Sequence, residues 1–147
     1  MRRLLASGAL GLLLLLPACS DGAGTPAPTS PDLTDESERL TAELTALDTV
    51  TSAEVQVRSG ATWGQQVVID AATSSADPGE QLAVLDRLVH AGWDTVAFVP
   101  TDVSTVLTAP GGVVLDARDL GFPHQGAGPT GLYERFGPPA ANPAWRP

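Results

Sequence analysis

Three side chains in the last third of the chain have the types and spacing of a metal site. Asp116, Asp119 and His124 follow a short apolar stretch and lie within nine residues of one another. Carboxylate and imidazole groups are common ligands of divalent metals, and residues after a strand end can converge in a loop. One histidine with two loop aspartates is more often a solvated loop, so we predict no metal and no cofactor. A small-molecule or metal site on the Asp116–His124 loop remains the alternative.

The sequence patterns of several enzyme classes are missing. There is no Gly-x-Ser-x-Gly motif, and because the chain has no lysine, neither a Ser-x-x-Lys pair nor a Walker A loop can form. Gly126-Ala127-Gly128 lies in a proline-rich segment, which is the wrong context for a dinucleotide loop. With no acid, base and nucleophile at workable spacing, we predict that the protein is not an enzyme and has no catalytic residues.

The charge balance restricts the possible partners. The chain carries 17 acidic and 8 basic residues, and two of the basic ones, Arg2 and Arg3, lie at the extreme N-terminus. Such an acidic chain lacks the basic footprint that nucleic acid or an anionic lipid surface would require. We therefore expect no nucleic-acid partner. Cys19 is the single cysteine, so no intrachain disulfide is possible.

The N-terminal residues have the organisation of an export signal. Arg2 and Arg3 precede an apolar run over 4–16, which is too short for an ordinary membrane-spanning helix. The run ends in Leu16-Pro17-Ala18-Cys19, which resembles the bacterial lipobox. The resemblance implies cleavage before Cys19, acylation of its thiol with fatty acids such as palmitate, and a lipid anchor on the extracytoplasmic face of the cell membrane.

Composition divides the chain into four parts. Residues 1–18 would be the signal peptide, and residues 19–31 the lipidated cysteine with a flexible linker rich in Gly, Pro, Ser and Thr. Residues 32–125 have the alternating patterns of a folded domain. Residues 126–147 form a Gly/Pro-rich C-terminal tail, in which residues 132–136 could make one helical turn that docks on the domain; the rest is either poorly ordered or a segment for a partner. The second reading rests on its aromatic residues Tyr133, Phe136 and Trp145.

The folded part begins with a predicted helix. Leu40 and Leu44 repeat at helical spacing, and Asp35 followed by Glu38 has the pattern of a capping box, which predicts a helix over 35–47. The solvated side of this helix would carry Glu36, Glu38, Arg39 and Glu43.

Strands and a second helix follow. Alternating polar and apolar residues predict strands over 53–58 and 62–72, joined as an antiparallel hairpin. Asp77 and Pro78 indicate a helix start, and Gly92 indicates its end. Its apolar stripe would be Leu82, Leu85, Leu88 and Val89. Further strands are predicted over 95–99 and 113–116, with 102–108 open as a strand or a short helix. Trp63 and Trp93 are expected to fill the core, and His90 to be structural.

The element order predicts an α+β fold. We expect a two-layer sandwich in the order αββαββ, with a four-stranded, mostly antiparallel sheet and two helices on one face. This order resembles ferredoxin-like folds and the BON-type modules of bacterial envelopes, although no motif supports the resemblance. Together with the anchor, it predicts a membrane-anchored lipoprotein whose small non-enzymatic domain binds a protein or another envelope component.

Overall fold

The computed structural model describes residues 32–62 and 64–147. The expected signal peptide, the lipobox cysteine Cys19, the linker and the core position expected for Trp63 lie outside the described residues. In the part of the chain that is described, no helix is long and apolar enough to cross a membrane.

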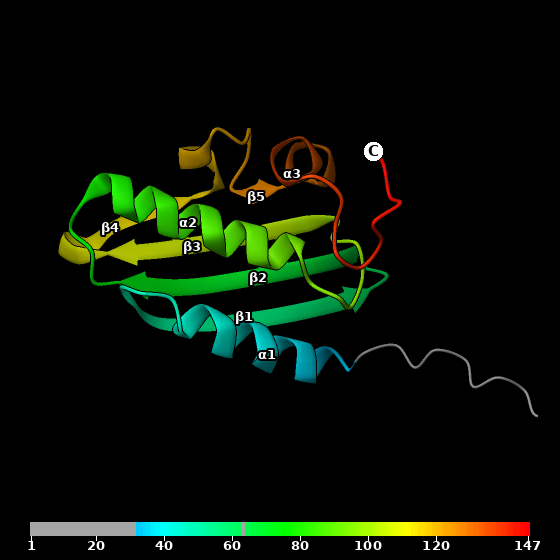
Figure 1. Cartoon of the computed structure of the whole chain (residues 1–147), viewed down its shortest axis with the longest axis horizontal. Coiled ribbons are helices and arrows are strands. Elements are labelled where there is room, and N and C mark those ends of the chain that lie inside the picture. Colours follow the sequence, from blue (N-terminus) through cyan, green and yellow to red (C-terminus); the bar gives the residue numbers. More distant parts are fainter. Residues whose placement is uncertain (1–31, 63) are drawn as a thin grey trace, which may run out of the picture.

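The described chain forms three helices and a five-stranded mixed sheet (Figure 1). The first half contains α1 (Leu33–Thr45), β1 (Val50–Gly60), β2 (Gly64–Thr73) and α2 (Pro78–Trp93). The second half contains β3 (Asp102–Ala109), β4 (Val113–Asp116), β5 (Gly126–Ala127) and α3 (Pro129–Phe136), with short 3-10 turns η1 (Pro110–Gly112) and η2 (Ala117–Leu120) on either side of β4. The predicted αββαββ order is therefore confirmed, and β5 and α3 follow it.

The sheet has the strand order β1-β2-β3-β4. The β1–β2 pair is the predicted antiparallel hairpin, whereas β2 and β3 run parallel because α2 carries the chain back between them. β4 and β5 both pair antiparallel with β3, along different parts of the same edge. The sheet thus has five strands rather than the four expected, because the segment after residue 125 contributes β5.

All three helices pack against one face of the sheet. The core takes Leu40 and Leu44 from α1, Leu85 and Leu88 from α2, and Leu132 from α3. These side chains meet the sheet residues that point to the same side, namely Val55, Val57, Val67, Ile69, Ala71, Val103 and Leu107. The prediction of two helices on one face was therefore too low by one, and the docked turn considered over 132–136 is the last part of the eight-residue helix α3.

The prediction of a strand over 95–99 is wrong. Those residues form a bent connection, and the strand that follows α2 is β3. The connection is apolar because it packs into the core through Phe98, and Thr95 is fully buried. A buried loop and a buried strand give the same short apolar run, so periodicity cannot separate them.

The helix ends differ from the predicted ones at two places. α1 begins at Leu33 because Asp32, and not Asp35, accepts a hydrogen bond from the backbone N–H of Thr34. α2 starts as predicted, with the Asp77 carboxylate capping the N–H of Glu80. It does not stop at Gly92, because this glycine lies inside the last helical turn, which ends at Trp93.

Gly92 marks the closest approach of α2 to the sheet. A methyl group at this position would lie 2.7 Å from Val103 Cγ1 and 3.2 Å from Ile69 Cδ1. Both neighbours are fully buried. The missing side chain of Gly92 therefore sets the distance between helix and sheet.

Glu36 is buried although its position in the helix suggested a solvated residue. Its side chain is 3% exposed. Oε1 accepts hydrogen bonds from Thr95 Oγ1 at 2.7 Å and from the N–H of Val96 at 2.9 Å, and Arg39 forms a two-pronged ion pair with the carboxylate. The hydrogen bond from Arg39 is the largest cause that lowers the pKa of Glu36 from 4.5 to about 2, with burial opposing it. The carboxylate ties the first turn of α1 to the connection after α2.

The helix α1 also closes the free edge of β1. Thr41 Oγ1 accepts a hydrogen bond from the N–H of Val55 at 3.2 Å, and Ser37 Oγ accepts one from the N–H of Val57 at 3.0 Å. Ser37 and Thr41 are four residues apart and so lie on the same side of the helix. These bonds occupy backbone donors that would otherwise offer an edge for pairing with another strand.

We expect Gly92→Ala to destabilise the fold by about 1–2 kcal/mol. Overpacking costs roughly 1–3 kcal/mol, and the better helix propensity of alanine returns up to about 1 kcal/mol. Urea denaturation of the full chain measures this. The matched control is Gly60→Ala, where a methyl group meets nothing within 4 Å. In a Val103→Ala background, Gly92→Ala should cost clearly less, and an unchanged cost would contradict the contact.

We expect Glu36→Gln to destabilise the fold at neutral pH by roughly 3 kcal/mol at most, which is the free energy that corresponds to the lowered pKa. Because the pKa is lower in the folded state, ionised Glu36 stabilises the fold above about pH 4.5 and loses this effect as the pH falls towards 2. The gap between wild type and Glu36→Gln should therefore shrink from pH 6 to pH 3 in denaturant titrations.

Glu43→Gln is the matched control for this ion pair. Glu43 binds the same Arg39 at 2.8 Å, but its side chain is 53% exposed. Exposed pairs contribute little, so its loss should cost less than about 0.5 kcal/mol. Equal losses at the two positions would show that burial of Glu36 is not what stabilises the fold.

Candidate functional site

Hydrogen bonds within the loop hold two of the three candidate metal ligands, Asp116 and Asp119. Both oxygens of the Asp116 carboxylate accept hydrogen bonds from the Arg118 side chain. These hydrogen bonds are the largest cause that lowers the pKa of Asp116. Asp119 Oδ2 accepts a hydrogen bond from the N–H of Asp116 at 2.8 Å, which completes a capping box around η2. Both carboxylates therefore already hold the turn.

His124 is exposed and does not complete a metal site with these aspartates. In residues 32–62 and 64–147, no three His, Cys, Asp or Glu side chains lie close enough together to hold a metal ion. Asp116 and Asp119 instead accept hydrogen bonds from the protein's own N–H groups in the capping box.

Aromatic residues tie the C-terminal segment to the fold. Trp93 is fully buried, and its indole N–H donates to the carbonyl of Gly137 at 2.9 Å. Trp145 packs edge-on against both Trp93 and Tyr133, with ring centroids 5.6 and 5.8 Å apart. The aromatic residues that suggested a partner-binding segment therefore contact this chain. The core position expected for Trp93 is confirmed.

His90 packs against the same segment. Its ring stacks on Phe136 with centroids 4.4 Å apart, and its Nε2 lies 3.2 Å from Asp94 Oδ2. His90 is exposed on its other side. It holds α3 against the end of α2, as a structural residue would.

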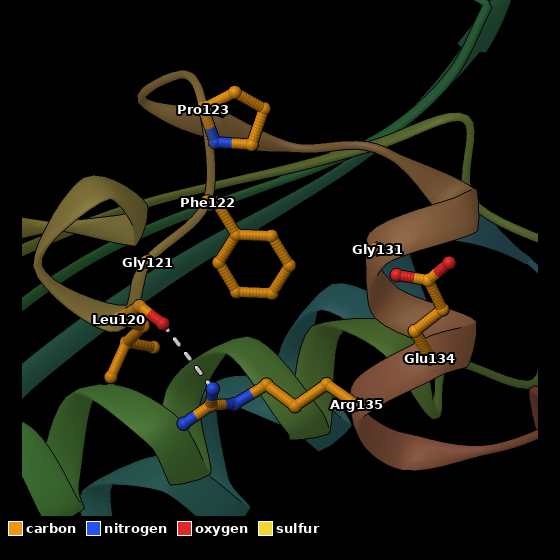
Figure 2. A pocket seen from close by; sticks show the side chains of 7 residues that line it. All are labelled: Leu120, Gly121, Phe122, Pro123, Gly131, Glu134 and Arg135. Atoms are coloured by element: carbon orange, nitrogen blue, oxygen red, sulfur yellow. Dashed lines mark hydrogen bonds between the residues drawn. The ribbon is translucent and has the colours of Figure 1, made fainter.

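One groove lies beside the loop that follows η2. It has a volume of about 330 Å³ and is formed by Leu120–Pro123 on one side and by α3 on the other. Figure 2 shows the ring of Phe122 pointing towards α3 and Arg135 reaching across to the carbonyl of Leu120. Arg135 also pairs with Asp86, so its charge is compensated. The remaining polar side chain of the groove is Glu134.

None of the helices in residues 32–62 and 64–147 covers the opposite face of the sheet. We call this surface the open face. It consists of the alternate strand residues that point away from the core: Ser52, Glu54, Gln56 and Arg58 of β1, Gln66, Val68, Asp70 and Ala72 of β2, Asp102, Ser104, Val106 and Thr108 of β3, and Val114 and Asp116 of β4. None of these residues belongs to the hydrophobic core or packs against it.

The open face is both apolar and acidic. Val68 and Val106 are half-buried, and Val114 is 62% exposed. Glu54 and Asp70 are exposed and stand directly opposite each other on neighbouring strands. Antiparallel strands with one solvated face are common, but that face is normally polar. The three valines, one exposed and two half-buried, give this face an apolar character that the core does not use.

The sequence predicted which residues of β1 point outward on this surface, but it did not predict the outward valines of β2 and β3. The alternation in β1 put Glu54, Gln56 and Arg58 on the wet side, as the structure does. Val68 and Val106 were missed because they are apolar residues at outward positions. The signal was available in the unbroken apolar run 67–69 and in the apolar pair 106–107, where alternation should have placed a polar residue.

Comparison with known protein families, with curated proteins and with solved structures found no match to this chain. The assignment of function therefore rests on the chemistry of the sequence and on the surfaces just described.

Proposed function

We propose that this protein is a lipid-anchored, non-enzymatic binding protein of a bacterial cell envelope. Leu16, Ala18 and Cys19 supply the lipobox pattern, and two or more acyl chains on Cys19 would give stable attachment. The acidic body offers no electrostatic attraction to anionic lipid, so attachment depends on this residue. The body would work on the extracytoplasmic face of the membrane.

The open face is the observation that carries the binding role. Val68 and Val106 lie on strands in the middle of the sheet, where a polar residue would cost nothing if the face met only water. By contrast, the titratable side chains that could have suggested chemistry, such as Asp116, Asp119 and His90, hold the protein's own structure. A surface for a protein or another envelope component fits this distribution better than a catalytic site.

The architecture supports the same proposal in a weaker way. Two layers in the order αββαββ match the element order of BON-type envelope modules and of ferredoxin-like folds, and we extend that resemblance to this body. A fold alone does not define a function, so the resemblance adds only that small two-layer domains suit binding roles.

We expect Cys19→Ser to release the protein from the membrane. Fractionation of cells that express the full chain should move it from the membrane pellet to the soluble extracytoplasmic fraction, and palmitate labelling should vanish, because serine is not acylated in this pathway. Ser20→Ala, the neighbouring change, should leave both properties intact. A Cys19→Ser protein that stays in the pellet with unchanged gel mobility would refute the lipid anchor.

A second candidate function is a small-molecule or metal site at the Asp116–His124 loop, and the groove beside Phe122 favours it. Our main proposal predicts that Ca²⁺, Mn²⁺ or Zn²⁺ alone changes the melting temperature of the full chain by less than about 1 °C. A rise of several degrees that disappears in His124→Ala or Glu134→Gln would instead support the second candidate. Neither substitution touches the ion pair at Asp116.

A further inference from the structure

We propose that the open face docks an amphipathic helix of a partner protein, with an apolar stripe flanked by arginine or lysine side chains. This inference deepens the proposed binding role by naming the surface and the chemistry of the partner. It depends on three properties of the open face, which are the arrangement of its valines, the position of its charges and the fact that the described helices all lie on the other side of the sheet.

The valines form a diagonal across three strands. Val68 of β2 is two residues before Asp70, which pairs with Val106 of β3. Val106 in turn is two residues before Thr108, which pairs with Val114 of β4. Each step moves one strand sideways and two residues along, on the same face of the sheet. An apolar stripe of this shape fits one elongated apolar edge, such as that of a helix.

Acidic side chains flank the diagonal. Glu54 and Asp70 lie on one side of Val68, and Asp102 lies on the other side, two residues before Ser104, the partner of Val68. Like charges directly opposite each other weaken a sheet, so the Glu54–Asp70 pair is unfavourable for the isolated fold. None of the five ion pairs among the described residues includes Glu54, Asp70 or Asp102.

This lack of compensation contrasts with the other faces of the molecule. There, arginines of the chain itself neutralise Glu36 and Asp86. On the open face, Arg118 pairs with Asp116, the strand partner of Val106, whereas Arg58 donates its hydrogen bond to the neutral side chain of Gln56. Glu54 and Asp102 accept hydrogen bonds from the side chains of Gln56 and Gln66, which are neutral and leave the negative charges unbalanced. Cations from outside would therefore find carboxylates without an ion pair on both sides of an apolar stripe, which is charge complementarity for a basic amphipathic helix.

The same charges argue against two other occupants. A second copy of the chain would bring Glu54 and Asp70 against an equally acidic face, so a symmetric sheet-to-sheet dimer is repelled. An anionic lipid surface is repelled for the same reason. A helix is the natural cover because helices already form the other layer on this sheet.

The test measures binding of a defined peptide to the purified full-length chain by fluorescence anisotropy. The probe is a helical peptide of about 18 residues with leucines along one stripe and arginines on both sides of it. A second peptide keeps the leucines and replaces each arginine with glutamate. We expect the arginine peptide to bind at least tenfold more tightly than the glutamate peptide, and to lose affinity as salt is raised.

Variants of the protein locate the binding surface. Glu54→Gln with Asp70→Asn removes two charges, and Val68→Thr with Val106→Thr removes the apolar contact while keeping the β-branched shape. Each pair of changes should weaken the arginine peptide at least fivefold. Glu38→Gln with Asp48→Asn removes the same charge from exposed positions off the open face and should change binding less than twofold.

Three results would overturn the proposal. One is equal binding of the two peptides, and another is an equal loss in the Glu38/Asp48 variant and the Glu54/Asp70 variant. The third is self-association of the full chain in sedimentation that disappears in the Val68/Val106 variant, which would assign the face to a second copy. Circular dichroism checks that each variant is folded. The assay does not use the lipid, so its outcome is independent of Cys19→Ser.

Discussion

One buried carboxylate joins the two halves of this fold. Glu36, in the first turn of α1, accepts hydrogen bonds from Thr95 and Val96 in the connection that follows α2. With α1 held there, Ser37 and Thr41 reach the outer N–H groups of β1, and Leu40 and Leu44 enter the core. A charge that is expensive to bury is tolerated because Arg39 and the two donors replace its water.

As a result, the two faces of the sheet have different surroundings. All three helices and the aromatic C-terminal segment lie on the core side, where Arg39 and Arg135 balance Glu36 and Asp86. On the open face, Glu54, Asp70 and Asp102 form no ion pair within the described chain, and Glu54 and Asp102 accept hydrogen bonds from neutral glutamine side chains. The start of α1 and the C-terminus lie at the same end of the sheet (Figure 1).

Local signals in the sequence were reliable where a single residue decides a structure. Asp77 and Pro78 placed the start of α2, and alternation placed the β1–β2 hairpin. The prediction was wrong where the surrounding structure decides the conformation of a segment. The apolar run 95–99 is a buried connection and not a strand, and the Gly/Pro-rich segment from 126 on contributes β5 and α3 because the docking site for it, around Trp93, is formed by residues far away in the chain.

The candidate sites follow the same division. Sequence by itself determined the α+β class, the acidic balance, the resemblance of the residues before Cys19 to a lipobox and the lack of the catalytic motifs sought, because these depend on residue types and short spacings. Only the tertiary structure decided that Glu36 is buried, that Asp116 and Asp119 hold a turn, and that Val68 lies beside uncompensated carboxylates. Each of these depends on which strands become neighbours and which face the helices cover, and that is fixed by packing over the whole domain.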